Sequence, residues 1–400
     1  MHSMDAADTT AILDRARGTA EVLSRGSAEV DRGLLAPHRG YRLIREAGLL
    51  TLLVPREFGG EGLSFLDYTK VLEALATGDG AVALGFNAHN VAIGSLCDTG
   101  GSPLPAAADR FRTWLFAEVV EHGRMFASAT TETGTGAGLH HIRATYRDTG
   151  DGYILKGTKS CVPLAGIADH YVVAAREEGA AIADEVSHFV VSKDDPGVSF
   201  TTAGDATTGN AAAPRGTRTA TLTMSEVAVP RQRLFLGEEG LSLFRLVREP
   251  HWAVSGCLGA YLGIAESILR LTVRFLRSQE HRRSSPTLQA DVGRLAVDLE
   301  AARALVYSAA RLVDEEKGSP EAHTAVHAAK YCMTELAPRL ALGAVRICGA
   351  DALTGPGPME RLLREATFCS VLPAGPEACL EYVGKSTLGF NMLDTRTFDW

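Results

Sequence analysis

The segment YILKGTKSCV, residues 153–162, has the composition of a β-strand, and four neighbouring segments share that character. They are rich in β-branched and aromatic residues and are separated by Asp-Gly, Asp-Pro and Gly-rich breaks: DHYVVAAREE, SHFVVSKDD, VSFTTAG and TATLTMSEVAVP. Several short strands at this spacing are typical of an antiparallel sandwich or barrel. Residues 123–235 are therefore predicted to form a β domain.

Both flanks of this β domain carry helical patterns. Residues 1–122 include two long segments with apolar residues at three- and four-residue spacing, TTAILDRARGTAEVLSRGSAEVDRG and LDYTKVLEALATGDGAVALGFNAHNVAIGSL. Pro55 and the pair Gly59–Gly60 indicate a turn between them. Residues 236–400 contain long, periodic, Ala/Leu-rich segments that predict a bundle of antiparallel helices. The predicted fold is multi-domain α+β, with an N-terminal helical domain, a central antiparallel β-sandwich or barrel domain and a C-terminal four-helix bundle.

Composition argues against several classes of function. The 400-residue chain is 46% hydrophobic and 22% charged, which is typical of a globular protein. Its net charge of −8 offers no attraction for nucleic acid or an anionic membrane surface. The seven cysteines are scattered without metal-ligand spacing, so we expect no metal site and a reducing compartment. The N-terminus is unlike a secretory signal, and the apolar stretch 252–265 is too short to span a bilayer, so we expect a cytoplasmic protein.

Five segments, in order along the chain, resemble motifs of the acyl-CoA dehydrogenase superfamily of flavoproteins. They are LLVPREFGGEGLSFLDYTKVLEALA (52–76), ASATTETGTGAG (127–138), YILKGTKSCV (153–162), RGTRTATLTMSEVAVPRQRLF (215–235) and the pair AVRICGAD and MERLLREA (344–366). The resemblance covers nearly the whole chain and implies the family's three-part architecture, with a flavin between the β domain and the bundle. It implies FAD as the cofactor, or FMN if the protein is a monooxygenase.

The resemblance also implies residues that contact the flavin ring. A flavin needs hydrogen-bonding groups for its ring edge and an apolar wall for its faces. Ser128, Thr130 and Thr131 supply hydroxyl groups, and Thr131 falls on a family threonine that contacts the flavin. Cys161 stands where the family has a tryptophan over the flavin, and Pro163 replaces a flavin-binding threonine.

A second set of residues matches the family's contacts to the pyrophosphate and adenine side of the cofactor. They are Arg277 and Gln279 in FLRSQEH, with Arg346 and Gly349 in RICGAD. Because the family's arginine reaches the cofactor of a neighbouring subunit, Arg277 implies a homo-oligomer, either a tetramer or a dimer.

The family's catalytic base is a glutamate in the loop after MERLLREA, where it removes the α-proton of an acyl thioester while hydride leaves the β-carbon. In LPAGPEA that position falls on Ala374, or on Pro373 in an unshifted alignment, and neither can accept a proton. Some family members carry the base on the first bundle helix, where this chain has Ala253. Glu249 lies one helical turn earlier and is the remaining candidate base, and Pro250 after it suits a helix start.

Two further positions bear on the substrate, and three functions stay open. Ala137 replaces a family serine that helps to hold the thioester, while His89 is either a residue near the substrate cavity or a structural histidine. We favour α,β-dehydrogenation of an unusual acyl thioester, bound to CoA or a carrier protein, in secondary metabolism. The alternatives are monooxygenation of a small molecule with reduced flavin and O₂, which needs no α-proton base, and a catalytically silent binding subunit. A dehydrogenase or a monooxygenase would exchange electrons with a partner, either an electron-transfer flavoprotein or a flavin reductase.

Overall fold

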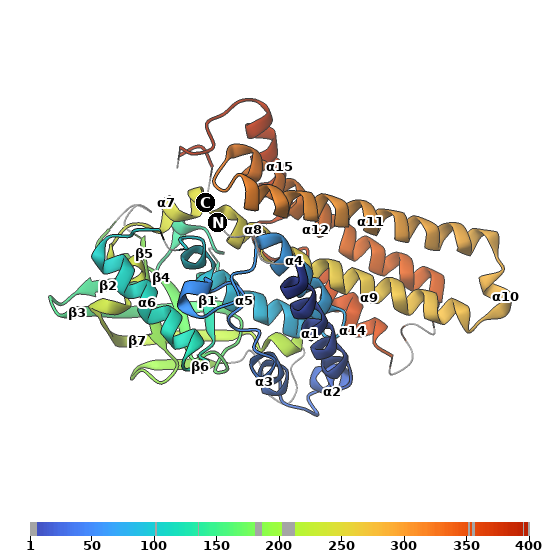
Figure 1. The fold of residues 1–400 in the computed structure, drawn as a ribbon, viewed down its shortest axis with the longest axis horizontal. Coiled ribbons are helices and arrows are strands. Elements are labelled where there is room, and N and C mark those ends of the chain that lie inside the picture. The colour runs from blue at the N-terminus through green and yellow to red at the C-terminus, as the bar shows by residue number, and fades with distance from the viewer. Residues whose placement is uncertain are drawn as a thin grey trace.

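The computed structural model describes residues 6–100, 102–134, 136–180, 186–201, 213–350, 353, 357–394 and 396–398. Helices, then a sheet, then helices follow one another along the chain, which confirms the predicted three-part architecture (Figure 1). The first part consists of α1 (Ala6–Ser24), α2 (Ser27–Asp31), α3 (His38–Glu46), α4 (Phe65–Ala76), α5 (Gly80–Cys97) and α6 (Ala106–Val120). Short 3₁₀ turns are η1 (Arg56–Phe58), η2 (Leu139–His141), η4 (Arg215–Thr217), η5 (Arg231–Arg233) and η6 (Phe235–Gly237).

The second long helical segment of the sequence divides into α4 and α5 at Gly78 and Asp79. A Cβ at Gly78 would lie 2.1 Å from the backbone oxygen of Ala20, so only glycine lets α1 pass this close. Asp79 then starts α5, because its carboxylate accepts the N–H of Val82 at 3.0 Å. This break buries α5 along nearly its whole length between the other helices and the sheet.

The sheet contains β1 (Phe126–Ala129), β2 (Thr145–Asp148), β3 (Gly152–Val162), β4 (His170–Glu177), β5 (Val186–Ser192), β6 (Val198–Thr201) and β7 (Ala220–Pro230). Its order is β1-β4-β2-β3-β7-β6, with β5 pairing to β4. The sequence predicted antiparallel pairing, and this holds for β2–β3, β3–β7, β4–β5 and β6–β7. However, β1 and β2 both pair with β4 in parallel. Both pairs join strands that are far apart in the chain, and parallel pairing needs such a long crossover.

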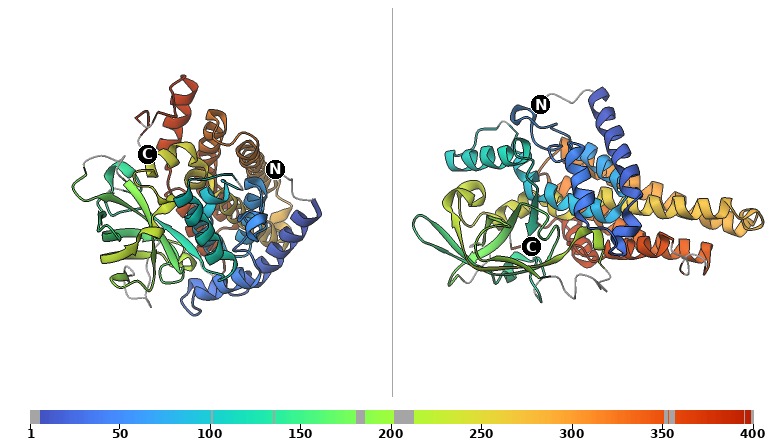
Figure 2. Two further views of the ribbon diagram at one scale, coloured as in Figure 1. Left: turned by 60° about the vertical axis from the view of Figure 1, so that its left-hand side comes forward. Right: turned by 90° about the horizontal axis from the view of Figure 1, so that it is seen from below.

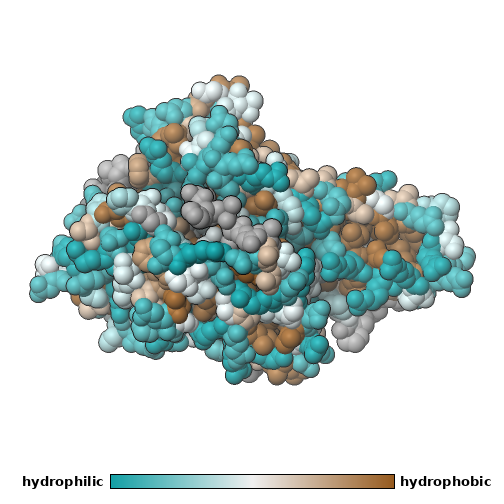
Figure 3. Space-filling model, viewed as in Figure 1, coloured by the Kyte–Doolittle hydropathy of each residue, from teal (hydrophilic) through white to brown (hydrophobic). Residues whose placement is uncertain are grey.

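The C-terminal part consists of α7 (Ser242–Arg248), α8 (Pro250–Ser255), α9 (Leu258–Arg277), α10 (Glu280–Arg283), α11 (Pro286–Glu315), α12 (Pro320–Cys348), α14 (Met359–Phe368) and α15 (Pro376–Thr387). Helices α9, α11, α12 and α14 pack together as a bundle whose far end, at α10, projects away from the sheet (Figures 1 and 2). Apolar residues show on the surface of this projecting end (Figure 3). Val297 and Leu305 of α11 and Leu342 of α12 are among the exposed apolar side chains.

Helix α9 runs through the bundle against α4. A Cβ at Gly263 would lie 2.3 Å from the backbone oxygen of Glu73, so this glycine lets the two helices touch. The stretch Pro250–Arg277 is long and apolar enough, by length and composition alone, to cross a membrane. Its most apolar window is 78% buried within the protein, as expected of a helix at the centre of a bundle.

Candidate active site

A cavity of about 570 Å³ lies where the sheet meets α5, α7, α8 and the loop between α14 and α15. Its volume is that of a typical small-molecule site. It brings together predicted site residues from segments that are far apart in the chain: Ser128, Thr130, Thr131, Ala137, Cys161, Pro163, Glu249, Ala253, Pro373 and Ala374.

The sheet side of the cavity is built from the ends of β1 and β3. Ser160 N–H donates to the carbonyl oxygen of Thr131 at 2.8 Å, which fixes the chain just beyond β1. Behind this wall, Lys159 Nζ donates to Glu132 Oε1 at 2.7 Å and to the carbonyl oxygen of Thr130 at 3.3 Å, within a fully buried ion pair. Burial lowers the pKa of Lys159 to about 8, although the charge of Glu132 acts against this shift. The ion pair therefore holds the strand ends rigidly behind the cavity.

The hydroxyl groups on this wall suit the polar edge of a flavin. Ser128, Thr130 and Thr131 line the cavity, and their side-chain oxygens make no hydrogen bond to any residue that the structure describes. A flavin ring presents carbonyl oxygens and ring nitrogens that such hydroxyls can bind. The residues present on the sheet side thus fit the ring of the cofactor that the sequence predicted.

The helix side of the cavity carries Glu249, at the break between α7 and α8. Its backbone dihedral angles (φ −133°, ψ 51°) are not helical, and Pro250 follows as the first residue of α8. Glu249 Oε2 is buried and has no hydrogen-bond partner among the described residues. Burial raises the pKa of this carboxyl group, while the charge of Arg245 partly opposes the shift. Such a carboxylate is suited to accept a proton from a bound molecule.

The position of α8 is fixed by Asp98, at the end of α5. Its carboxylate accepts hydrogen bonds from His251 Nε2 at 2.9 Å, Trp252 Nε1 at 2.7 Å and Lys317 Nζ at 2.5 Å. Burial alone would raise the pKa of Asp98, but the bonds from His251 and Lys317 hold it below its usual value. Because Asp98 anchors both residues after Pro250, the first turn of α8 and the adjacent Glu249 are held in place.

The loop between α14 and α15 reaches the same cavity but brings no acid or base. Leu372, Pro373, Ala374 and Gly375 all line it. Ala253 of α8 lines it as well, so both positions where the resemblance places a base are alanine. Glu249 is the one carboxylate among the lining residues that the structure describes.

Three domain models together match most of this chain. They are the acyl-CoA dehydrogenase N-terminal domain over residues 7–104, the middle domain over 127–227 and the C-terminal domain over 255–379. The chain belongs to the acyl-CoA dehydrogenase superfamily. The boundaries of the three models follow the helix–sheet–helix order of the structure.

Known superfamily members are similar to this chain over nearly its whole length. The short-chain specific acyl-CoA dehydrogenase of Rattus norvegicus is 25% identical over 351 residues, which is 86% of this chain and 81% of the relative. Glutaryl-coenzyme A dehydrogenase, solved as a complex with glutaryl-CoA, superposes with a TM-score of 0.85 at 22% identity, over 98% of each chain. Dibenzothiophene monooxygenase (TdsC) of Paenibacillus sp. A11-2 superposes with a TM-score of 0.82 at 23% identity, over 96% of this chain and 99% of that one. The structural matches show that dehydrogenases and a monooxygenase share this superfamily fold.

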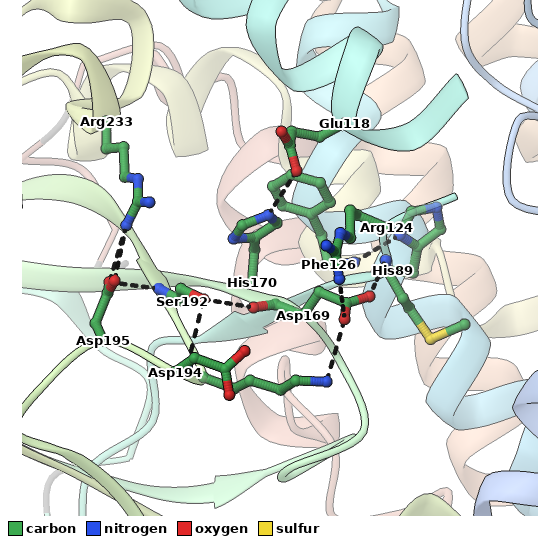
Figure 4. Close-up of polar contacts among 12 residues, drawn as sticks. His89, Glu118, Arg124, Phe126, Asp169, His170, Ser192, Asp194, Asp195 and Arg233 are labelled. Carbon is green, nitrogen blue, oxygen red and sulfur yellow. Dashed lines mark hydrogen bonds and ion pairs between the residues drawn. The ribbon is translucent and has the colours of Figure 1, made fainter. Parts of the chain in front are cut away.

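His89 does not line the cavity, and its contacts support the structural one of the two roles that the sequence left open. His89 is fully buried; its Nδ1 accepts the N–H of Phe126 at 3.0 Å and its Nε2 bonds to the carbonyl oxygen of Leu50 at 3.0 Å. Burial lowers its pKa to about 4, so the ring is neutral. Figure 4 shows His89 beside Phe126, where the sheet begins and where Asp169 binds neighbouring cations. The histidine therefore ties α5 to β1, which is the structural role left open by the sequence.

The four residues predicted to contact the pyrophosphate and adenine side lie elsewhere. Arg277 ends α9, which starts beside the cavity at Leu258 and extends 20 residues, about 30 Å. Gln279 follows Arg277, and Arg346 and Gly349 lie at the end of α12, near the end of α9. Arg277, Gln279 and Arg346 are exposed. None of the four lines the cavity of its own chain, so their predicted contacts to a cofactor would have to be made to another subunit.

Sequence reasoning missed the polar residues at one end of the cavity. Arg245, Ser95, His188 and Ser242 come from α7, α5, β5 and the start of α7. Only Arg245 carried a usable signal, because it lies four residues before Glu249 in the sequence. The structure describes no group of three or more His, Cys, Asp or Glu side chains placed to hold a metal ion.

Proposed function

We propose that this protein is a flavin-dependent dehydrogenase of an acyl thioester, with Glu249 as the base. The observation that carries the proposal is the buried, unpartnered Oε2 of Glu249, in the same cavity as Ser128, Thr130 and Thr131. Since Ala253 and Ala374 occupy the family's base positions, Glu249 is the lining carboxylate left to do this work.

When bound, a flavin supplies the acceptor for the hydride that leaves the β-carbon of the thioester. The hydroxyl groups of Ser128, Thr130 and Thr131 would bind and orient its ring. A carboxylate oxygen of Glu249 would take the α-proton, and the buried site then favours the resulting neutral acid over the charged form. Leu84 and Trp252 are among the apolar residues that exclude water from the cavity.

A homo-oligomer, a tetramer or a dimer, is part of this proposal. Arg277 and Arg346 lie at the projecting end of the bundle, away from the cavity, where only another subunit's cofactor would be within reach. The exposed apolar side chains on α11 and α12 support contacts between subunits there. In such an assembly the cofactor would be FAD, because FAD has the pyrophosphate and adenine that these arginines would bind.

The second candidate is a flavin-dependent monooxygenase. One observation favours it: the cavity has alanine at both family base positions, and oxygenation by reduced flavin and O₂ needs no α-proton base. In support, TdsC, which shares the fold, has been solved with FMN. This reading implies a flavin reductase as partner, whereas the dehydrogenase implies an acceptor such as an electron-transfer flavoprotein.

The purified holoprotein mixed anaerobically with saturated acyl-CoAs of several chain lengths tests the proposal. Loss of the flavin absorbance band with any of them is the expected result. Absence of bleaching, with NAD(P)H-dependent O₂ consumption in the presence of a flavin reductase, would favour the monooxygenase. A protein with no affinity for flavin would contradict both and indicate a silent binding subunit.

A further inference from the structure

One end of the cavity is formed by a partly buried cation, Arg245, and three polar side chains. The Arg245 guanidinium lies over the ring of Phe235 at 4.1 Å and donates to Ser95 Oγ. Beside it, Ser242 Oγ and His188 Nδ1 lie 2.6 Å apart. All five residues line the cavity, so their polar groups face a bound molecule together.

Arg245 is charged and, among the described residues, makes no hydrogen bond or close ion pair with a carboxylate, although the nearby charge of Glu249 raises its pKa. Burial lowers its pKa only to about 10, so the guanidinium keeps its proton at neutral pH. Glu249 lies four residues later, and its N–H donates to the carbonyl oxygen of Arg245 at 2.8 Å, yet their side chains form no ion pair. Ser95 takes one of the five N–H donors that a guanidinium offers. A partly buried cation that lines a cavity favours the binding of an anion there.

The neighbouring groups add donors without adding charge. Burial and the charges of Arg245 and Lys159 lower the pKa of His188 to about 3, so its ring is neutral. The contact between Ser242 and His188 leaves one N–H or O–H of the pair available to a ligand oxygen. This end of the cavity therefore offers one positive charge and several neutral donors.

We propose that Arg245, with Ser95, Ser242 and His188, binds a carboxylate on the acyl portion of the substrate, at the end remote from the thioester. This inference rests on the proposed function, because it assumes an acyl thioester. Among the lining residues that the structure describes, Arg245 is the one cationic side chain, which balances one carboxylate and not a phosphate dianion. A guanidinium also matches the two oxygens of a carboxylate with two parallel hydrogen bonds.

The spacing of Arg245 and Glu249 indicates a short acyl chain. Glu249 follows the last residue of α7, and its N–H bonds to the carbonyl oxygen of Arg245, so the two residues lie about one helical turn apart. A substrate whose α-carbon meets Glu249 therefore has only a few bonds before its carboxylate meets Arg245. Short ω-carboxyacyl thioesters, derived from dicarboxylic acids, satisfy both contacts.

Binding can be measured apart from turnover in the Glu249→Gln holoprotein. The probes are succinyl-, glutaryl- and adipyl-CoA, each paired with the acyl-CoA in which an isopropyl group replaces the terminal carboxylate. We expect at least one carboxylate to bind about 10- to 100-fold more tightly than its isopropyl counterpart in isothermal titration calorimetry. Adding Arg245→Met should abolish that preference. Adding Arg248→Met, on the exposed side of the same helix, should preserve it.

The result in the protein with Arg245 intact decides the proposal even if the methionine variant does not fold. Equal binding of each pair, or no binding of either member at any length, overturns the carboxylate site. A carboxylate preference that survives Arg245→Met in a folded protein overturns the assignment to Arg245. A preference for carboxylates without flavin bleaching in the wild-type protein would support the binding site and reject dehydrogenation. Flavin bleaching in the wild-type protein without a preference for carboxylates would support dehydrogenation and reject the carboxylate site.

Discussion

Replacing Glu249 with glutamine should slow reduction of the flavin by an acyl thioester about 10²- to 10⁴-fold, which is the usual contribution of a general base. That loss corresponds to about 3–5 kcal/mol of transition-state stabilisation. Glutamine keeps the size of the side chain and removes only its capacity to accept the α-proton. Glu249 Oε2 has no hydrogen-bond partner in the described structure, so the substitution breaks no bond at that oxygen. We therefore expect unchanged flavin content and a melting temperature close to that of the wild type.

The assay is anaerobic stopped-flow absorbance, which follows the flavin band after mixing with the best acyl-CoA. Glu377→Gln is the matched control, because Glu377 is an exposed carboxylate at the start of α15, beside the loop that reaches the cavity, and does not itself line the cavity. It should reduce at the wild-type rate. Equal rates for wild type and Glu249→Gln would refute the assignment of Glu249 as base.

The pH dependence of this reaction gives an independent check. Only ionised Glu249 accepts a proton, so the rate rises with pH as the carboxyl group ionises. Burial raises its pKa, and the rise should be centred above 4.5, the ordinary value for glutamate. The charge of Arg245 holds this pKa down, so Arg245→Met should move the rise to still higher pH. If Glu249→Gln keeps the pH profile of the wild type, the ionisation that sets this profile belongs to another group.

Four other substitutions test the site and the fold. Ala374→Glu, introduced into Glu249→Gln, should restore flavin reduction about tenfold or more if the loop still directs residue 374 at the α-proton; no recovery in stopped-flow would show that this geometry is lost. Gly263→Ala places a Cβ 2.3 Å from a backbone oxygen of α4 and should cost about 1–3 kcal/mol in urea unfolding. Gly293→Ala has open space around it in α11 and should stabilise by about 0.5–1 kcal/mol, so equal effects of the two would contradict the α9–α4 packing. Burial raises the pKa of Glu365 from 4.5 to about 7, so the folded protein holds this proton more tightly than the unfolded chain. The free energy of unfolding should therefore fall by roughly 3 kcal/mol as pH rises from about 4.5 to about 7. In Glu365→Gln, the urea midpoint should change less with pH over this range.

The local sequence pattern predicted those features of the fold that depend on residues close together in the chain. Helix periodicity and short β-branched segments gave the three-part order, and Pro250 marked the start of α8. The parallel pairing of β1 and β2 with β4 was missed, because register between distant strands depends on contacts that no local pattern contains. The sequence left the role of His89 open for a similar reason, since its two backbone partners, Leu50 and Phe126, lie far from it in the chain.

The amino-acid sequence alone shows which candidate groups this site lacks and which it has. Alanine at positions 253 and 374 means that the family's usual base is absent. Glu249 and the hydroxyl residues near Thr131 can be read from the sequence before their positions in the fold are known. That these residues share one cavity with Arg245, and that Glu249 Oε2 is buried without a hydrogen-bond partner among the described residues, depends on how the elements pack together. The physical reason is that burial and the distance between charges set the chemistry of a carboxylate. Both arise from packing between elements that lie far apart in the chain.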